Sequence, residues 1–173
     1  AKLAQFALVY MRALRALWRV RNSIDSADYD YRAFNSRLLP QRWWQRKRYH
    51  LLLGLIGDPL RVLDTGCGSS QLLNGLPQIV GMDIKNSKLR FMRRPGRRLV
   101  NASTFHLPFA DHSFGVVVSS QVIEHIAADE GIFEEFARVL EPGGTLVVGT
   151  TDYGRWQWPL IEQIYGFLHP GGY

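Results

Sequence analysis

Short apolar runs alternate with segments of helical pattern over residues 61–150, and this alternation restricts the fold more than any other feature of the chain. The runs predict strands, and the segments between them predict helices. Strands separated by helices are typical of parallel βαβ units. The sequence therefore predicts an α/β fold, a three-layer, doubly wound and mostly parallel sheet of the Rossmann-like kind. The expected strands are 61–65, 78–83, 97–102, 115–120 and 145–150, and the expected helical segments are 71–76, 87–94 and 129–140.

The last of these helices is amphipathic. We expect Phe133, Phe136 and Leu140 to face inward, because they recur at helical spacing. The charged stretch EEFAR at 134–138 is interpreted as a solvated face. The sequence PGG at 142–144 is expected to end the helix before the final strand.

Charge divides the chain into two parts. Residues 1–50 hold 11 Lys and Arg against 3 Asp and Glu, a net charge of +8, whereas residues 51–173 hold 10 against 12. We predict a basic aromatic helical segment at 1–57 and a Rossmann-like domain at 58–173. The single Cys67 excludes an internal disulfide and a Cys-rich zinc site, so we expect no metal and a reducing, cytoplasmic location.

In open parallel sheets, ligands bind beyond the carboxyl ends of the strands. Here the first strand runs into the glycine loop of VLDTGCGSS at 62–70, where Gly66 and Gly68 allow a tight turn and a close approach. Asp83 ends the next strand, 19 residues after Asp64, and a carboxylate there can accept two hydrogen bonds from a ribose diol. We therefore expect a nucleoside to lie across the first two strands.

The loop does not match a dinucleotide-binding site. A dinucleotide fingerprint requires a third glycine where Gln71 stands, and Asp64 would face a pyrophosphate unfavourably. The same carboxylate suits a cationic amine. A nucleoside with a positive amino-acid arm fits these residues better than one with phosphates, and S-adenosylmethionine has that arm.

Four successive motifs resemble those of class I S-adenosylmethionine-dependent methyltransferases, and most closely the broad group called type 11. They are VLDTGCGSS, GMDIK, LPFADHSFGVVVSSQVIEHI and FARVLEPGGTLVVGT, which together cover about residues 60–150. The resemblance implies S-adenosylmethionine as cofactor and nine positions around it. These cofactor-binding positions are Asp64, Gly66, Cys67, Gly68, Asp83, Ile84, Ser103, Thr104 and Gln121.

The family usually has an acidic residue where Ser103 stands, beside the adenine, and often a third glycine where Ser70 stands. Ser103 can still accept a hydrogen bond from the adenine amine, with less strength than a charged group. We interpret Cys67 as a small loop residue and not as a nucleophile, which would require a basic partner nearby.

The resemblance implies a transferase that moves a methyl group in line to a small-molecule or lipid-like acceptor. Such an enzyme acts mainly by proximity and orientation, so no catalytic residue can be named, and His125 and Tyr153 are candidates only. The alternative is a binding module that keeps the nucleoside fold without turnover. A nicotinamide-dependent oxidoreductase is a third interpretation, against which Gln71 argues.

Trp18, Trp43 and Trp44 lie among many arginines in the first 50 residues. Three interpretations stay open for this segment: helices that cover the sheet, a membrane-surface contact and, ranked last because no known module is visible, nucleic-acid binding. Localisation is thus expected to be cytoplasmic, with peripheral contact to a membrane as an option. The oligomeric state is left open.

The family sheet has seven strands, but only 23 residues follow position 150. We therefore expect the C-terminal strands to be missing and the domain at 58–173 to be truncated at its C-terminus. An apolar strand left unpaired at a sheet edge would favour association.

Overall fold

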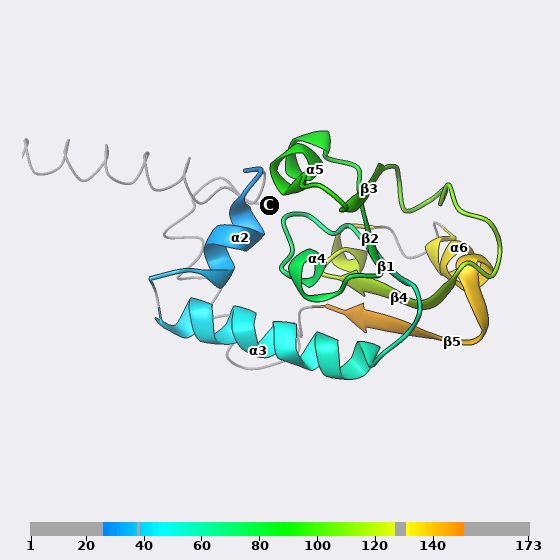
Figure 1. The fold of residues 1–173 in the computed structure, drawn as a ribbon, viewed down its shortest axis with the longest axis horizontal. Helices are drawn as coiled ribbons and strands as arrows, with labels where there is room; N and C mark the ends of the chain where they lie inside the picture. The colour runs from blue at the N-terminus through cyan, green and yellow to red at the C-terminus, as the bar shows by residue number, and fades with distance from the viewer. Residues whose placement is uncertain (1–25, 38, 127–130, 151–173) are drawn as a thin grey trace, which may run out of the picture. The chain divides into compact units, whose positions relative to one another are not determined.

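The computed structural model describes residues 26–37, 39–126 and 131–150. Contacts within the chain divide it into two compact units, and the described residues belong almost entirely to the unit Ala27–Thr151. A parallel sheet with strand order β3-β2-β1-β4-β5 forms the centre of this unit (Figure 1). Its strands are β1 (Val62–Thr65), β2 (Ile79–Asp83), β3 (Arg98–Asn101), β4 (Phe114–Ser120) and β5 (Leu140–Gly149).

Helices cover both faces of the sheet. They are α2 (Tyr29–Phe34), α3 (Leu39–Ile56), α4 (Leu72–Gly75), α5 (Asn86–Met92) and α6 (Ile132–Val139), with a short 3₁₀ turn, η1 (Ile123–His125). In Figure 1, α4 and α5 lie to the left of the strands and α6 lies to the right. None of the described helices combines the length and hydropathy that a membrane span requires.

Adjacent residues of the central strands point to opposite faces and join two separate cores. Val62 of β1 packs in a core that includes Leu52 and Ile56 of α3. Leu63, the next residue, packs with Phe136 of α6 in the other core. Strands buried on both faces explain why the sequence shows continuous apolar runs here and not an alternation of apolar and polar residues.

The predicted fold class is confirmed, with small shifts at element ends. The strand predicted at 145–150 begins earlier, at Leu140, which pairs with Phe114 before a register irregularity. Leu52 and Ile56 place the end of the basic aromatic stretch in the sheet's core. The domain boundary after residue 57 stays a prediction, because residues 1–25 lie outside the described residues.

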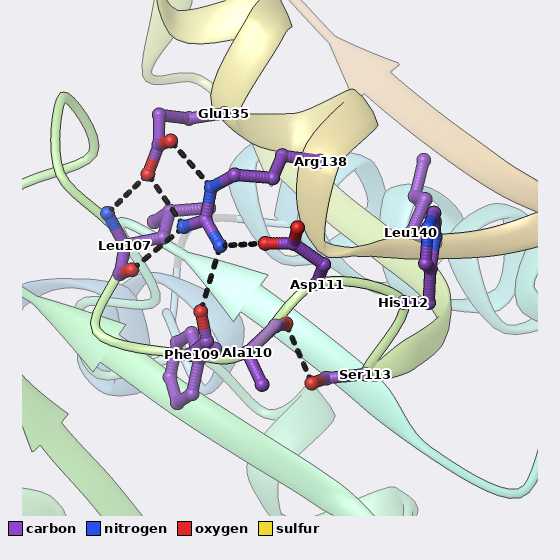
Figure 2. A network of polar contacts seen from close by, with 9 residues as sticks. All are labelled: Leu107, Phe109, Ala110, Asp111, His112, Ser113, Glu135, Arg138 and Leu140. Carbon is purple, nitrogen blue, oxygen red and sulfur yellow. Dashed lines mark hydrogen bonds and ion pairs between the residues drawn. The ribbon is translucent and has the colours of Figure 1, made fainter.

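A polar network, drawn in Figure 2, joins α6 to the loop between β3 and β4. The Arg138 guanidinium donates to both carboxylate oxygens of Glu135 at 2.7 and 2.9 Å and to Asp111 at 2.7 Å. It also donates to the carbonyls of Leu107 and Phe109 at 2.9 and 2.8 Å. The hydrogen bonds that Glu135 accepts from Arg138, and one from the N–H of Leu107 at 2.7 Å, lower the pKa of Glu135 to about 2, so this carboxylate stays ionised.

This network corrects the interpretation of 134–138 as a merely solvated face, since Glu135 and Arg138 hold the loop of the motif LPFADHSF. Phe136 is fully buried as expected, but Phe133 was wrongly assigned to the interior, because 49% of it is exposed. Periodicity alone could not separate these two phenylalanines.

Arg138→Met is expected to lower the melting temperature by about 5 °C or more, because two backbone carbonyls and two carboxylates lose their shared donor. Thermal unfolding followed by circular dichroism measures the shift. Arg61→Met is the matched control, since Arg61 forms only an exposed pair with Glu141 at 2.9 Å. Equal shifts for the two variants would contradict a structural role of the network.

Candidate active site

The described residues that sequence analysis assigned to the cofactor lie near or just beyond the carboxyl ends of strands. Because all five strands are parallel, these ends meet at one edge of the sheet. The sheet order reverses at β1, which pairs with both β2 and β4, and this is where α/β sheets bind ligands. At this edge lie Asp64, Gly66, Cys67, Gly68, Asp83, Ile84, Ser103, Thr104 and Gln121.

The glycine loop after β1 requires both of its glycines. Gly66 and Gly68 have φ angles of +63° and +53°, a region that favours glycine. A side chain at Gly66 would overlap Val122, and one at Gly68 would overlap the carboxylate of Asp30. The side chains of Val122 and Asp30 thus occupy the space beside these two glycines and pack against the loop.

Asp83, the last residue of β2, holds this loop. Its Oδ2 accepts the N–H of Gly68 at 2.8 Å, and its Oδ1 accepts the N–H of Lys85 at 2.7 Å. The side chain is only 6% exposed. The Asn101 amide steadies the same turn by donating to the carbonyls of Asp83 and Ile84. Each carboxylate oxygen keeps lone pairs for further donors, such as sugar hydroxyls.

Asp64 is a buried carboxylate without a full set of partners. It lies in β1 beside the loop, is 3% exposed, and its Oδ2 accepts no hydrogen bond from any described residue. The pKa of Asp64 is raised to about 7, mainly by burial; Arg48 opposes the shift, and the charges of Asp30 and Asp83 contribute to it. An unpartnered buried acceptor is costly, and a cationic donor would satisfy it.

A serine of the loop anchors helix α2. The Ser69 hydroxyl accepts the N–H groups of Asp30 and Tyr31 at 3.0 and 3.3 Å, and these groups have no acceptor within the helix. In return, the N–H of Ser69 donates to Oδ2 of Asp30 at 3.0 Å. Lys88 of α5 lies 3.8 Å from the same oxygen. Sequence reasoning missed this contact of Asp30 and Ser69 beside the glycine loop.

Arg48 reaches this edge from α3 and donates to the side-chain oxygen of Gln121. Gln121 follows β4 with a φ of +60°, a conformation that is uncommon outside glycine. Burial lowers the pKa of Arg48, whereas Asp30 and Asp64 raise it. Arg48 was also missed, because nothing in its spacing separates it from the other arginines of this basic stretch.

The remaining predicted residues differ in environment. Cys67 is buried in the core, and burial raises the pKa of its thiol well above the ordinary value, so it is no nucleophile near neutral pH. Ile84 is 69% exposed. The Ser103 hydroxyl accepts the N–H of Phe105 at 3.3 Å in the turn after β3. His125 lies exposed at the end of η1, and Tyr153 falls outside the described residues.

The charges at this edge favour a cationic ligand. Asp30, Asp64 and Asp83 supply three carboxylates, against the two cations Arg48 and Lys88. The loop amides that could bind phosphate are occupied, since Gly68 and Ser69 donate to Asp83 and Asp30. S-adenosylmethionine fits this arrangement, because its sulfonium and ammonium outweigh its single carboxylate. The pyrophosphate of a dinucleotide does not fit.

Comparison with known proteins agrees with this geometry. Residues 63–148 match a family model described as a methyltransferase domain. The chain is 32% identical over 132 residues to a demethylmenaquinone methyltransferase of Beutenbergia cavernae, covering 73% of this chain and 53% of that protein. It is 31% identical to a ubiquinone/menaquinone biosynthesis C-methyltransferase of Haemophilus ducreyi, covering 70% and 52%. The chain spans about half the length of these two relatives.

Solved structures share the fold. A Pyrococcus horikoshii protein superposes with a TM-score of 0.63 at 25% identity, over 76% of this chain and 63% of that one. An S-adenosylmethionine-dependent methyltransferase of Thermotoga maritima gives a TM-score of 0.59 at 20% identity, over 81% and 69%. The cofactor of this family is S-adenosylmethionine. The chain therefore belongs to the class I S-adenosylmethionine-dependent methyltransferases, in the type 11 group.

Proposed function

We propose that this protein transfers the methyl group of S-adenosylmethionine in line to a small, lipid-like acceptor. The observation that carries the proposal is Asp64, a buried carboxylate with an unsatisfied oxygen beside the glycine loop. A methionine ammonium supplies the cationic donor that this oxygen lacks. The same group would bind a phosphate-bearing cofactor poorly.

The other residues of this edge would each bind a different part of the cofactor. Asp83 accepts hydrogen bonds from the ribose hydroxyls with the lone pairs that Gly68 and Lys85 leave free. Ser103 and Thr104 follow β3, where the adenine is expected. Arg48 acts on the charge of Asp64 and donates to Gln121, and it would hold the carboxylate of the methionine arm.

When bound, S-adenosylmethionine supplies an electrophilic methyl carbon next to a positively charged sulfur. The protein's residues then align the acceptor and keep water away, and this positioning can supply most of the acceleration. Gln121, held by Arg48 and by a strained backbone, lies where the acceptor would approach. His125 stays a candidate base for acceptors that must lose a proton.

The lipid-like acceptor is supported by the outer face of α3. Trp44, Leu51 and Leu55 are 52%, 61% and 55% exposed, and positions four or seven residues apart share one side of a helix. This helix carries four Lys and Arg and no Asp or Glu. Exposed tryptophan and leucine beside cations suit the headgroup region of an anionic membrane. The two quinone-related relatives have names that agree with such an acceptor.

The double variant Trp44→Ser/Leu51→Ser is expected to weaken binding to anionic vesicles by about tenfold or more, because two large apolar side chains no longer enter the interface. Vesicle flotation with phosphatidylglycerol in phosphatidylcholine measures this. Leu60→Ser is the control, since Leu60 is 84% exposed but lies outside α3. If wild type and both variants float equally, or none floats, α3 is not the contact.

Two experiments test the proposed function. Calorimetric titration with S-adenosylmethionine should give one site with a Kd of about 1–100 μM, and NAD should give no heat of binding. Incubation with methyl-labelled donor and a lipid extract should then label a small lipid. Binding without any labelled product would favour the non-catalytic module, and label in an RNA fraction would refute the lipid-like acceptor.

A further inference from the structure

Away from the cofactor-binding edge, a pocket of about 270 Å³ lies among α2, the end of α4 and the segment that joins α5 to β3. None of the residues assigned above to the cofactor lines it. This volume is near the lower end of those that hold small ligands. The lining residues are Tyr31, Asn74, Phe91, Met92, Arg94 and Arg97.

The pocket lies in a strongly basic segment. Residues 84–110 hold seven Lys and Arg and no Asp or Glu. Within the described ranges, no carboxylate pairs with Arg94 or Arg97. Burial is the main cause that lowers the pKa of Arg97, and the like charge of Arg94 also lowers it. Two neighbouring guanidinium groups therefore lack an anion between them.

Neutral acceptors fix the orientation of both guanidinium groups. Arg94 donates to the carbonyls of Phe91 and Arg93 at 3.4 and 2.8 Å. Arg97 donates to the carbonyl of Met92 and to the side-chain oxygen of Asn74. Each guanidinium has five N–H groups, so donors remain for a ligand. A guanidinium that is already oriented loses less entropy when it binds an anion.

The other wall of the pocket is apolar. The rings of Tyr31 and Phe91 meet edge to face with their centroids 5.7 Å apart. Met92 is 3% exposed and belongs to the core below. The pocket thus combines a rigid aromatic side with a cationic side.

We propose that this pocket binds a phosphate group carried on an apolar or aromatic body. Paired arginines bind phosphate oxygens in the bidentate geometry that carboxylates and phosphates share, and the phosphate relieves the repulsion between Arg94 and Arg97. The aromatic edges contact the body of the ligand. The site shares no residue with the proposed cofactor site, so this proposal can be tested independently of methyl transfer.

Phenyl phosphate is the probe, and amide shifts of the ¹⁵N-labelled full chain are the readout. Shifts should appear at Asn74, Phe91 and Met92 and be absent with phenol. The double variant Arg94→Gln/Arg97→Gln should lower the affinity for phenyl phosphate by about tenfold or more, because charge-assisted hydrogen bonds are lost. Arg90→Gln/Arg93→Gln removes the same charge from the same segment outside the pocket, and should change the affinity by less than about twofold.

The single variant Arg94→Gln keeps the test valid if the double variant unfolds, since within the described ranges the Arg94 side chain donates only to the nearby carbonyls of Phe91 and Arg93. Vesicles of phosphatidic acid in phosphatidylcholine form a second arm. Arg94-dependent flotation identifies a lipid phosphate, and phenyl phosphate binding without flotation identifies a soluble one. No binding in either arm, shifts confined to residues 64–70, or equal weakening by the control pair would overturn the proposal.

Discussion

Asp64→Asn is expected to stabilise the unliganded protein near pH 8 while it abolishes affinity for S-adenosylmethionine. Asparagine has nearly the shape of a protonated aspartate, so it fits the buried position without carrying a charge there. It cannot supply the negative charge that the methionine ammonium requires. Urea unfolding and calorimetric titration measure the two effects on the same sample.

The pH dependence follows from the pKa of Asp64, which burial raises from 3.8 to about 7. Between these values the folded state holds a proton that the unfolded state has lost, so the free energy of unfolding falls as the pH rises. A shift of this size corresponds to a loss of up to about 4 kcal/mol, complete above pH 7. Asp64→Asn should remove that loss, and it should differ little from wild type near pH 4.

Cofactor binding is linked to the same proton. An ammonium beside Asp64 favours the ionised form, so S-adenosylmethionine should bind more tightly as the pH rises toward 7. Near pH 6 its binding should release protons, which calorimetry detects by repeating the titration in buffers of different ionisation enthalpy. Identical heats in all buffers, or an Asp64→Asn variant less stable than wild type near pH 8, would contradict this account of Asp64.

Much of this edge could be predicted from the sequence, because strand ends and a glycine loop are local patterns. Asp64 and Asp83 follow apolar runs, and parallel strands bring such ends together. The loop's two glycines adopt positive φ angles, which agrees with the tight turn predicted there. What a local pattern cannot show is how deeply a carboxylate is buried and how completely it is partnered, and burial is the main cause of the raised pKa of Asp64.

The contributions of α2 and α3 could not be predicted. Asp30 and Arg48 reach this edge from α2 and α3, and nothing in the sequence near either residue marks its partner, Ser69 or Gln121, which lies 39 or 73 positions away. The same holds for Arg138, because three of its five hydrogen bonds reach a loop about thirty residues earlier in the chain. The charge pattern identified the basic segment at 1–57, but it could not show that Arg48 within this segment acquires a specific partner.

Asp83→Asn, the same substitution at a neighbouring buried carboxylate, is expected to have the opposite effect on stability. Both oxygens of Asp83 accept backbone N–H groups, from Gly68 at 2.8 Å and Lys85 at 2.7 Å. An amide offers one oxygen, so its NH₂ must face one of these donors. The free energy of unfolding should fall by about 2–3 kcal/mol, the penalty for a buried donor left without an acceptor.

Affinity for the cofactor should fall by about a hundredfold or more in Asp83→Asn, because the loop shifts and the ribose loses a charged acceptor. Adenosine and 2′,3′-dideoxyadenosine, used as competitors of S-adenosylmethionine, separate these two causes. Wild type should bind adenosine more tightly than 2′,3′-dideoxyadenosine, because only adenosine carries the hydroxyls that can donate hydrogen bonds to Asp83. If Asp83→Asn keeps that preference, Asp83 only supports the loop. If Asp64→Asn and Asp83→Asn change stability near pH 8 in the same direction, the difference in partnering on which both roles depend is refuted.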